Sequence, residues 1–97
     1  MEVRIQSIHF DVSEQLSEFI NKKVDRLARK YPAMDYVDVN LTVLKAETAM
    51  NKQAVVKAIV PHHGEQVATK VADTFEEAID VALEAIERQL EKIKAKK

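Results

Sequence analysis

The residues of this sequence that could do chemistry are mostly charged, and they are grouped by sign along the chain. Residues 13–30 carry five bases and three acids, residues 73–84 carry five acids and no base, and residues 85–97 carry five bases and two acids. Grouped lysines and arginines can bind the phosphates of a nucleic acid. The formal net charge is −1, but local fields act over about one Debye length, ~8–10 Å, so this value does not exclude an anionic partner.

In residues 13–30 a helical period places the bases on one side of a helix. At about 100° per residue, the apolar residues from Leu16 to Tyr31 share one arc. The bases fall on roughly the opposite side, and they are Lys22, Lys23, Arg26, Arg29 and Lys30. Phe19 falls among the bases, and we expect it either to pack at the edge of the helix or to stack on a nucleobase.

A second helix, expected over residues 75–94, divides into an apolar, an acidic and a basic stripe. The acidic stripe consists of Glu77, Asp80, Glu84, Glu87 and Glu91. The basic stripe on the far flank consists of Arg88, Lys92 and Lys96, and Lys94 adds a base to the same tail. Solvated helix faces are usually charged, and cations suit the C-terminal end of the helix dipole. The segregation of signs therefore leaves two interpretations open, a nucleic-acid face and an ordinary solvated surface.

Groups that carry out catalysis or hold metals are scarce. The sequence has no cysteine, and its single glycine, Gly64, cannot form a glycine-rich phosphate loop. His62 and His63 are adjacent in an expected turn without a carboxylate at metal-ligand spacing, and His9 lies at a strand end. The acidic stripe is solvated, so it offers no general acid–base pair. We expect a protein that is not an enzyme and that uses no metal or cofactor.

Six elements are expected to position these residues. The periods predict strands at residues 2–8, 36–44, 53–60 and 65–71, and helices at residues 13–30 and 75–94. Asp11 or Ser13 can cap the first helix, which stops at Tyr31 because a proline follows. Either Asp73 or Thr74 can begin a capping box for the second helix.

The order β-α-β-β-β-α predicts an α+β fold with a four-stranded mixed sheet. A strand–helix–strand start favours a right-handed crossover between two parallel strands. The later strands are joined by short connections and should be antiparallel. Both helices then need the same face of the sheet to bury their apolar stripes.

Length and hydropathy limit the number of domains and the location of the protein. The 97 residues fit one domain, residues 1–97. The first residues lack the basic start and apolar run of a signal peptide, and no apolar stretch is long enough to cross a bilayer. We therefore expect a cytoplasmic protein without a membrane partner.

Four parts of the chain carry a family likeness. They are residues 5–13 with 15–20, Lys23-Val24-Asp25-Arg26-Leu27, Asp73-Thr74-Phe75-Glu76-Glu77-Ala78-Ile79-Asp80, and Ile86-Glu87-Arg88-Gln89-Leu90-Glu91-Lys92. With these segments, the whole chain resembles the ribosome-hibernation promoting factors, also described as ribosome-associated inhibitors and formerly called sigma-54 modulation proteins. The last two blocks resemble the family's Asp-Met-Tyr-x-Ala-Ile-Asp segment and its Lys-Leu-x-Arg-Gln-Leu-x-Lys continuation. Two departures, Glu76 for tyrosine and Ala85 for lysine, weaken the basic face.

The resemblance implies a fold similar to a double-stranded RNA-binding domain and a single ribosome-binding domain of the short form, without a C-terminal dimerisation domain. It implies a partner, the small ribosomal subunit with its rRNA and adjoining ribosomal proteins, whose mRNA and tRNA channel the protein occupies in stationary phase or under stress. The family's contacts carry over to Lys23, Arg26, Arg88 and Lys92. The other bases of the two helices are assigned from charge position alone, and we expect a monomer.

Two features of the sequence leave room for a different function. The acidic stripe of the second helix could bind a basic protein partner, with the lysine-rich tail serving solubility. In that case the protein is a protein–protein interaction module without RNA binding. The outcome depends on whether both helices present their bases on one outward surface.

Overall fold

Six elements follow one another in the order that apolar periodicity predicts. The computed structural model describes residues 2–8, 10–45 and 49–95, with the side chains of residues 94 and 95 outside that description. The elements are β1 (Glu2–Ile8), α1 (Glu14–Lys30), β2 (Tyr36–Val43), β3 (Lys52–Val60), β4 (Gly64–Ala72) and α2 (Phe75–Ala95). The expected order is confirmed, and each strand boundary lies within one residue of the expected one.

Side-chain caps decide where the two helices begin. The hydroxyl oxygen of Ser13 accepts a backbone N–H from the first turn of α1 at 3.1 Å, and that of Thr74 does the same for α2 at 3.1 Å. Asp73 instead accepts the backbone N–H of Met50 at 2.8 Å. Ser13 and Thr74 are therefore the caps among the alternatives that the sequence allows. Tyr31 ends α1, as expected for a residue before a proline.

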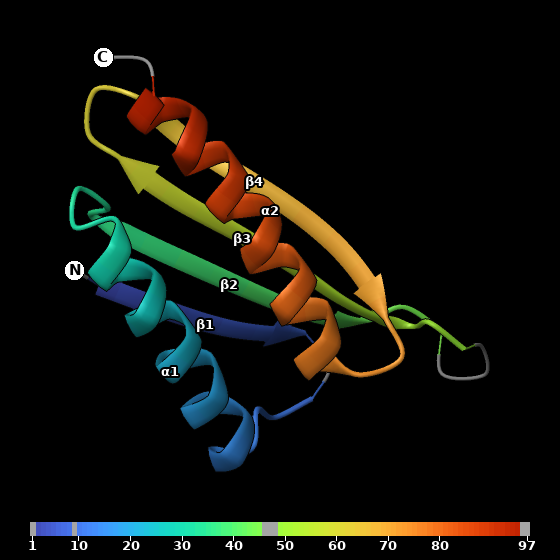
Figure 1. Ribbon diagram of the computed structural model, residues 1–97. Helices are drawn as coiled ribbons and strands as arrows, with labels where there is room; N and C mark the ends of the chain where they lie inside the picture. The colour runs from blue at the N-terminus through green and yellow to red at the C-terminus, as the bar shows by residue number, and fades with distance from the viewer. Residues whose placement is uncertain (1, 9, 46–48, 96–97) are drawn as a thin grey trace.

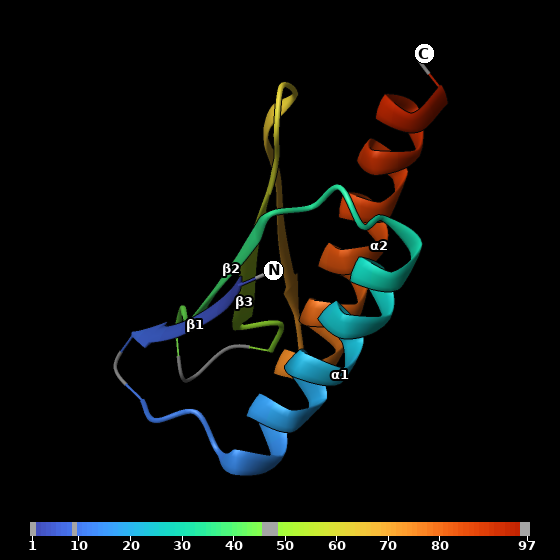
Figure 2. The same ribbon diagram turned by 90° about the vertical axis from the view of Figure 1, so that its left-hand side faces the viewer.

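The four strands form one mixed sheet in the order β1-β2-β3-β4. β1 and β2 are parallel and are connected through α1, while β2, β3 and β4 are antiparallel neighbours. Both helices lie on the same face of the sheet and run in the same direction (Figures 1 and 2). α2 packs on β3 and β4, and α1 lies beside it on the β1 side. The expected α+β architecture is confirmed.

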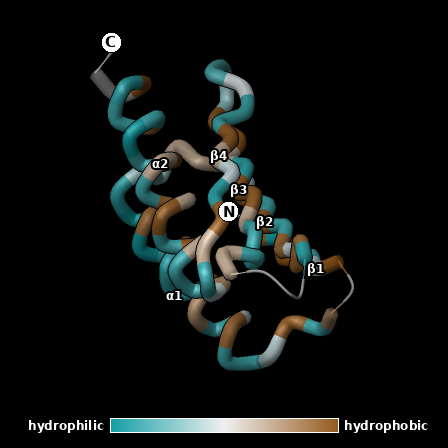
Figure 3. The backbone as a smooth tube through the Cα atoms, turned by 90° about the vertical axis from the view of Figure 1, so that its right-hand side faces the viewer, coloured by the Kyte–Doolittle hydropathy of each residue, from teal (hydrophilic) through white to brown (hydrophobic). Residues whose placement is uncertain are grey.

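The core lies between the sheet and the two helices. Val37, Val39 and Leu41 of β2 are fully buried, and so are Ala54 and Ala58 of β3. The alanine side chains are small, which allows α2 to lie close to the sheet. Burial of each large apolar side chain contributes roughly 1.5–3 kcal/mol. Apolar and polar residues alternate along most of β1 and β2, as expected for a sheet with one covered face, and Figure 3 shows hydrophobic stretches on both the strands and the helices.

Each helix has a buried apolar side and a charged side. α1 buries Ile20 and Val24, and α2 buries Ile79 and Ile86. The charged sides face outward and toward the neighbouring helix, so the packing of α1 beside α2 decides which charges meet. Within the described residues, neither helix is long and apolar enough to cross a membrane.

Candidate nucleic-acid interface

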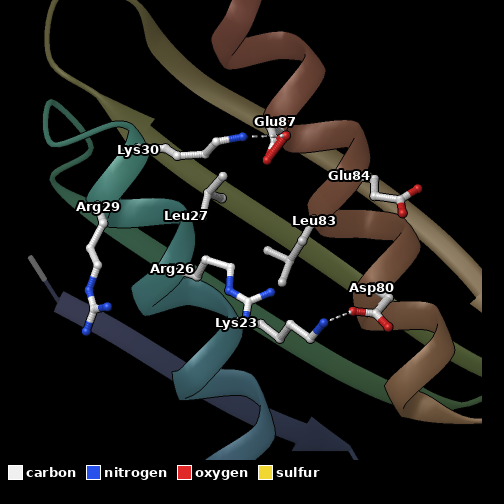
Figure 4. Close-up of a pocket in the computed structure, with 9 residues that line it drawn as sticks. All are labelled: Lys23, Arg26, Leu27, Arg29, Lys30, Asp80, Leu83, Glu84 and Glu87. Atoms are coloured by element: carbon white, nitrogen blue, oxygen red, sulfur yellow. Dashed lines mark hydrogen bonds and ion pairs between the residues drawn. The ribbon is translucent and has the colours of Figure 1, made fainter.

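Two ion pairs join the charged sides of α1 and α2. Lys23 Nζ lies 3.0 Å from Asp80 Oδ1, and Lys30 Nζ lies 3.5 Å from Glu87 Oε2. The two lysines are seven residues apart on α1, and the two acids have the same separation on α2. The parallel helices therefore repeat the same contact after about two turns (Figure 4). We call this line of contacts the interhelix seam.

Arg26 lies between the two ion pairs of the seam. The seam encloses an open hollow of about 480 Å³ whose lining includes Leu27 and Leu83, and Figure 4 shows Arg26 extending into the space between the helices. Arg26 is exposed and has no hydrogen-bond or ion-pair partner among the described residues. Its guanidinium can therefore present two donors to a phosphate.

The outward side of α1 carries two further bases. Arg29 Nη2 lies 3.1 Å from Asp25 Oδ2, and both side chains are mostly exposed, at 81% and 64%. Such an i,i+4 pair is worth only a few tenths of a kcal/mol, so a phosphate can displace the carboxylate. Lys22 is exposed and has no partner in the described part of the chain.

Phe19 packs at the edge of α1. It is half-buried against the hydrophobic core, and the Lys23 ammonium lies 5.5 Å from the centre of its ring. The ring therefore supports the seam from the side. This agrees with the first of the two roles expected for Phe19, packing at the helix edge.

Arg88 and Lys92 lie on the flank of α2 that faces away from α1. Glu87 points toward α1, and Arg88 follows it by about 100° around the helix. The next residue, Gln89, donates a hydrogen bond to the carbonyl oxygen of Val67 in β4 at 3.0 Å, so this flank faces the β4 edge of the sheet. Arg88 and Lys92 are exposed and have no partner among the described residues.

The bases of the two helices do not form one continuous surface. The acidic stripe of α2 lies between the bases of α1 and the pair Arg88 and Lys92. α1 packs against the acidic stripe through the pairs of Lys23 with Asp80 and Lys30 with Glu87. The bases therefore lie on two flanks, not on the one outward surface on which the nucleic-acid interpretation depends. Lys94 belongs to α2 but its side chain is outside the description, and Lys96 lies outside the described residues.

Tyr31 adds a third contact between the helices. Its hydroxyl donates a hydrogen bond to Glu91 Oε1. Burial raises the pKa of Tyr31 to about 12, and the hydrogen bond to Glu91 and the charges of Glu91 and Glu87 act in the same direction. Periodicity places Tyr31 on the apolar side of α1 but gives no sign of this bond.

The histidines within the description, His62 and His63, are exposed at the turn between β3 and β4. Among all the residues that the structure describes, no three His, Asp or Glu side chains are grouped closely enough to hold a metal ion. His9 lies outside the described residues.

Comparison with known sequences identifies the family. Residues 3–97 match the profile of the family described as sigma 54 modulation protein / S30EA ribosomal protein. The chain belongs to this family. It is also 30% identical over 96 residues to a ribosome hibernation promoting factor of Azotobacter vinelandii, covering 99% of this chain and 85% of that protein. The resemblance drawn from the sequence is therefore confirmed.

Solved structures share the fold of this S30EA family member. A ribosomal subunit interface protein from Coxiella burnetii superposes with a TM-score of 0.86 at 21% identity, covering 99% of this chain and 100% of that one. The N-terminal domain of Thermus thermophilus Protein Y superposes with a TM-score of 0.79 at 19% identity, covering 96% and 99%. At these identities the superpositions support the fold.

Proposed function

We propose that this protein binds the small ribosomal subunit and its rRNA in the cytoplasm and keeps ribosomes inactive in stationary phase or under stress. It acts as a monomeric single domain and occupies the channel that mRNA and tRNA use. Membership of the S30EA ribosomal protein family supports the association with ribosomes, and the Azotobacter vinelandii relative is named for ribosome hibernation.

Four exposed cations without a partner among the described residues carry the proposal: Lys22 and Arg26 on α1, and Arg88 and Lys92 on α2. They lie on two flanks separated by acids, so they suit a folded RNA that approaches from two sides better than one flat phosphate surface. Contacts of this kind read the shape and charge of the backbone more than the base sequence. Lys23, Arg29 and Lys30 are held by carboxylates and contribute after those pairs open.

The acidic stripe has a role inside the molecule. Asp80 and Glu87 each contact a lysine of α1, and Glu91 accepts a hydrogen bond from Tyr31, directly after α1. This leaves Glu77 and Glu84 of the stripe for an external partner. The observation does not favour the alternative of a protein-interaction module, because most of the stripe holds the two helices together.

Sedimentation with purified ribosomes at two salt concentrations tests the proposed function. If four phosphate contacts form, the affinity should fall by about 10²-fold between 50 and 200 mM salt, because each contact releases counterions. The double substitution Arg88→Glu with Lys92→Glu should abolish co-sedimentation and leave thermal unfolding nearly unchanged, because both side chains are exposed and neither pairs with another described residue.

A matched control carries the same change in net charge elsewhere. Lys45→Glu with Lys57→Glu alters the connection after β2 and the uncovered face of the sheet, and it should still co-sediment. Normal co-sedimentation of the Arg88 and Lys92 double variant would show that the basic flank of α2 does not bind the ribosome.

A further inference from the structure

A second hollow, of about 850 Å³, opens at the end of the molecule where α1 stops. It lies between the segment after α1, the β3–β4 turn and the C-terminal part of α2, where the hairpin tip and the helix diverge (Figure 2). Its walls are largely apolar and include Met34, Val60 and Leu90. We call it the end crevice. Its volume is within the range of pockets that hold small ligands, about 300–1,000 Å³.

Among the described residues that line the end crevice, the charged or titratable ones are Lys30, Tyr31, His62 and His63, and none is a carboxylate. Glu87 and Glu91 contact Lys30 and the Tyr31 hydroxyl from outside this lining. An imidazole can donate a hydrogen bond in either protonation state. Lys30 also lines the hollow of the interhelix seam, so the crevice continues the basic side of α1. Its ion pair with Glu87 is loose, at 3.5 Å, and the Lys30 side chain is 59% exposed.

His62 adopts a backbone conformation that favours glycine. The backbone N–H of His63 donates to the carbonyl of Val60 at 3.0 Å, which closes a turn with Pro61 and His62 at its centre. His62 has a φ of 71°. Proline followed by a residue with positive φ is the pattern of a type II turn, in which glycine or asparagine normally takes the second central position. A histidine there costs conformational free energy, and its side chain lines the end crevice.

We propose that the end crevice receives one unpaired nucleotide of the RNA to which the protein docks. This proposal rests on the proposed function and names a contact within it. The base lies among the apolar side chains and against the His62 ring, and the adjoining phosphate meets Lys30 and the imidazole N–H groups. A flat nucleobase joined to a phosphate fits apolar walls that are edged by Lys30 and two histidines. An apolar peptide would make no use of these three side chains.

The substitution His62→Gly tests the use of this side chain. Glycine relieves the strained φ, so the variant should unfold at a higher temperature than the unsubstituted protein. Loss of a stacking partner for one base should weaken ribosome binding about 5- to 10-fold. Opposite changes in stability and affinity would support a binding role, which a purely structural histidine would not produce. Unchanged affinity would overturn the proposal.

Met50→Gly is the matched control. Met50 is the other residue with positive φ that is not glycine in the described chain, at 55°, and it does not line the end crevice. Met50→Gly should raise the unfolding temperature in the same way and leave ribosome binding unchanged. An equal loss of affinity in both glycine variants would overturn the proposal, because the effect would then come from turn flexibility and not from the crevice.

A photoreactive benzoylphenylalanine at position 33 identifies what enters the crevice. Ala33 is exposed and lines it. Irradiation of the variant bound to purified ribosomes should produce a crosslink to rRNA. A crosslink to a ribosomal protein, or none from bound protein, would overturn the nucleotide assignment while the proposed function stands. Failure of the unsubstituted protein to co-sediment with ribosomes would overturn the proposed function, and the crevice proposal with it.

Discussion

Two basic regions of this protein contain the same residue types and differ in what surrounds them. In the interhelix seam, Lys23 and Lys30 are paired with acids of α2, and Arg26 lies between the two pairs. On the opposite flank of α2, Arg88 and Lys92 are exposed without a partner among the described residues. Sequence composition alone would rank these groups as equal sites for phosphate.

The difference indicates that the two groups of bases serve different purposes. The lysines of the seam are partly neutralised by internal carboxylates, so a phosphate has to displace a carboxylate before it can use their charge. A phosphate at Arg88 displaces water and counterions alone. We therefore expect the seam to contribute mainly to helix packing, and the free flank to contribute mainly to affinity.

Arg88→Ala and Lys23→Ala should separate these contributions most clearly. Arg88→Ala should weaken ribosome binding about 5- to 10-fold and reduce the salt dependence by about one phosphate contact. Lys23→Ala should change the affinity less than about 3-fold, because its charge is already partly neutralised by Asp80. Titration of both variants against ribosomes at several salt concentrations measures this, and equal losses for the two would refute the distinction.

The architecture could be read from the sequence because it depends on local patterns. Period-two segments give the strands, helical stripes give α1 and α2, and short connections give the antiparallel neighbours. The order then leaves one face of the sheet for both helices. The sequence does not decide between Ser13 and Asp11, or between Thr74 and Asp73, as helix caps. Each of these side chains is able to cap a helix.

The arrangement of the site depends on contacts between residues far apart in the chain. Lys30 meets Glu87 across 57 positions, and Tyr31 meets Glu91 across 60. A helical wheel gives each charge its angle on its own helix, but it does not give the direction in which the other helix lies. The positive φ of His62 could not be predicted from the sequence either. The segment from Pro61 to Gly64 suggests a positive φ at the glycine, and Gly64 does adopt one, at 75°.

Tyr31→Phe removes the third contact between the helices. The hydrogen bond from its hydroxyl to Glu91 should contribute about 0.5–1.5 kcal/mol to the free energy of unfolding at neutral pH. The raised pKa of Tyr31, about 12 against an ordinary value of 10.0, gives this contribution a definite pH dependence. It is fully present below pH 10 and is lost as the pH rises through 12, because the unfolded chain ionises first.

Denaturant unfolding at pH 8 and near pH 11.5 tests this dependence on Tyr31. The difference in stability between the unsubstituted protein and Tyr31→Phe should shrink at the higher pH. Absorbance near 295 nm should show a tyrosine titrating at about pH 12 that is missing in the variant. Tyr36→Phe is the control, since its ring contacts Arg4 on the uncovered sheet face. A late titration that persists in Tyr31→Phe would contradict the assignment.

The smallest expected effect is the coupling between Lys23 and Asp80. Their side chains are 33% and 46% exposed, so the pair should contribute about 0.3–1 kcal/mol, as measured for exposed ion pairs. A double-mutant cycle with Lys23→Ala and Asp80→Ala should give this coupling at low salt and a smaller value in 1 M salt, because salt screens exposed charges.

Glu84 and Arg88 supply the comparison cycle. They are at i,i+4 on α2 without an ion pair between them, so their coupling should stay within a few tenths of a kcal/mol. Equal coupling in the two cycles would mean that the seam is no more than ordinary surface charge, and the contrast between the two basic regions would then need another cause.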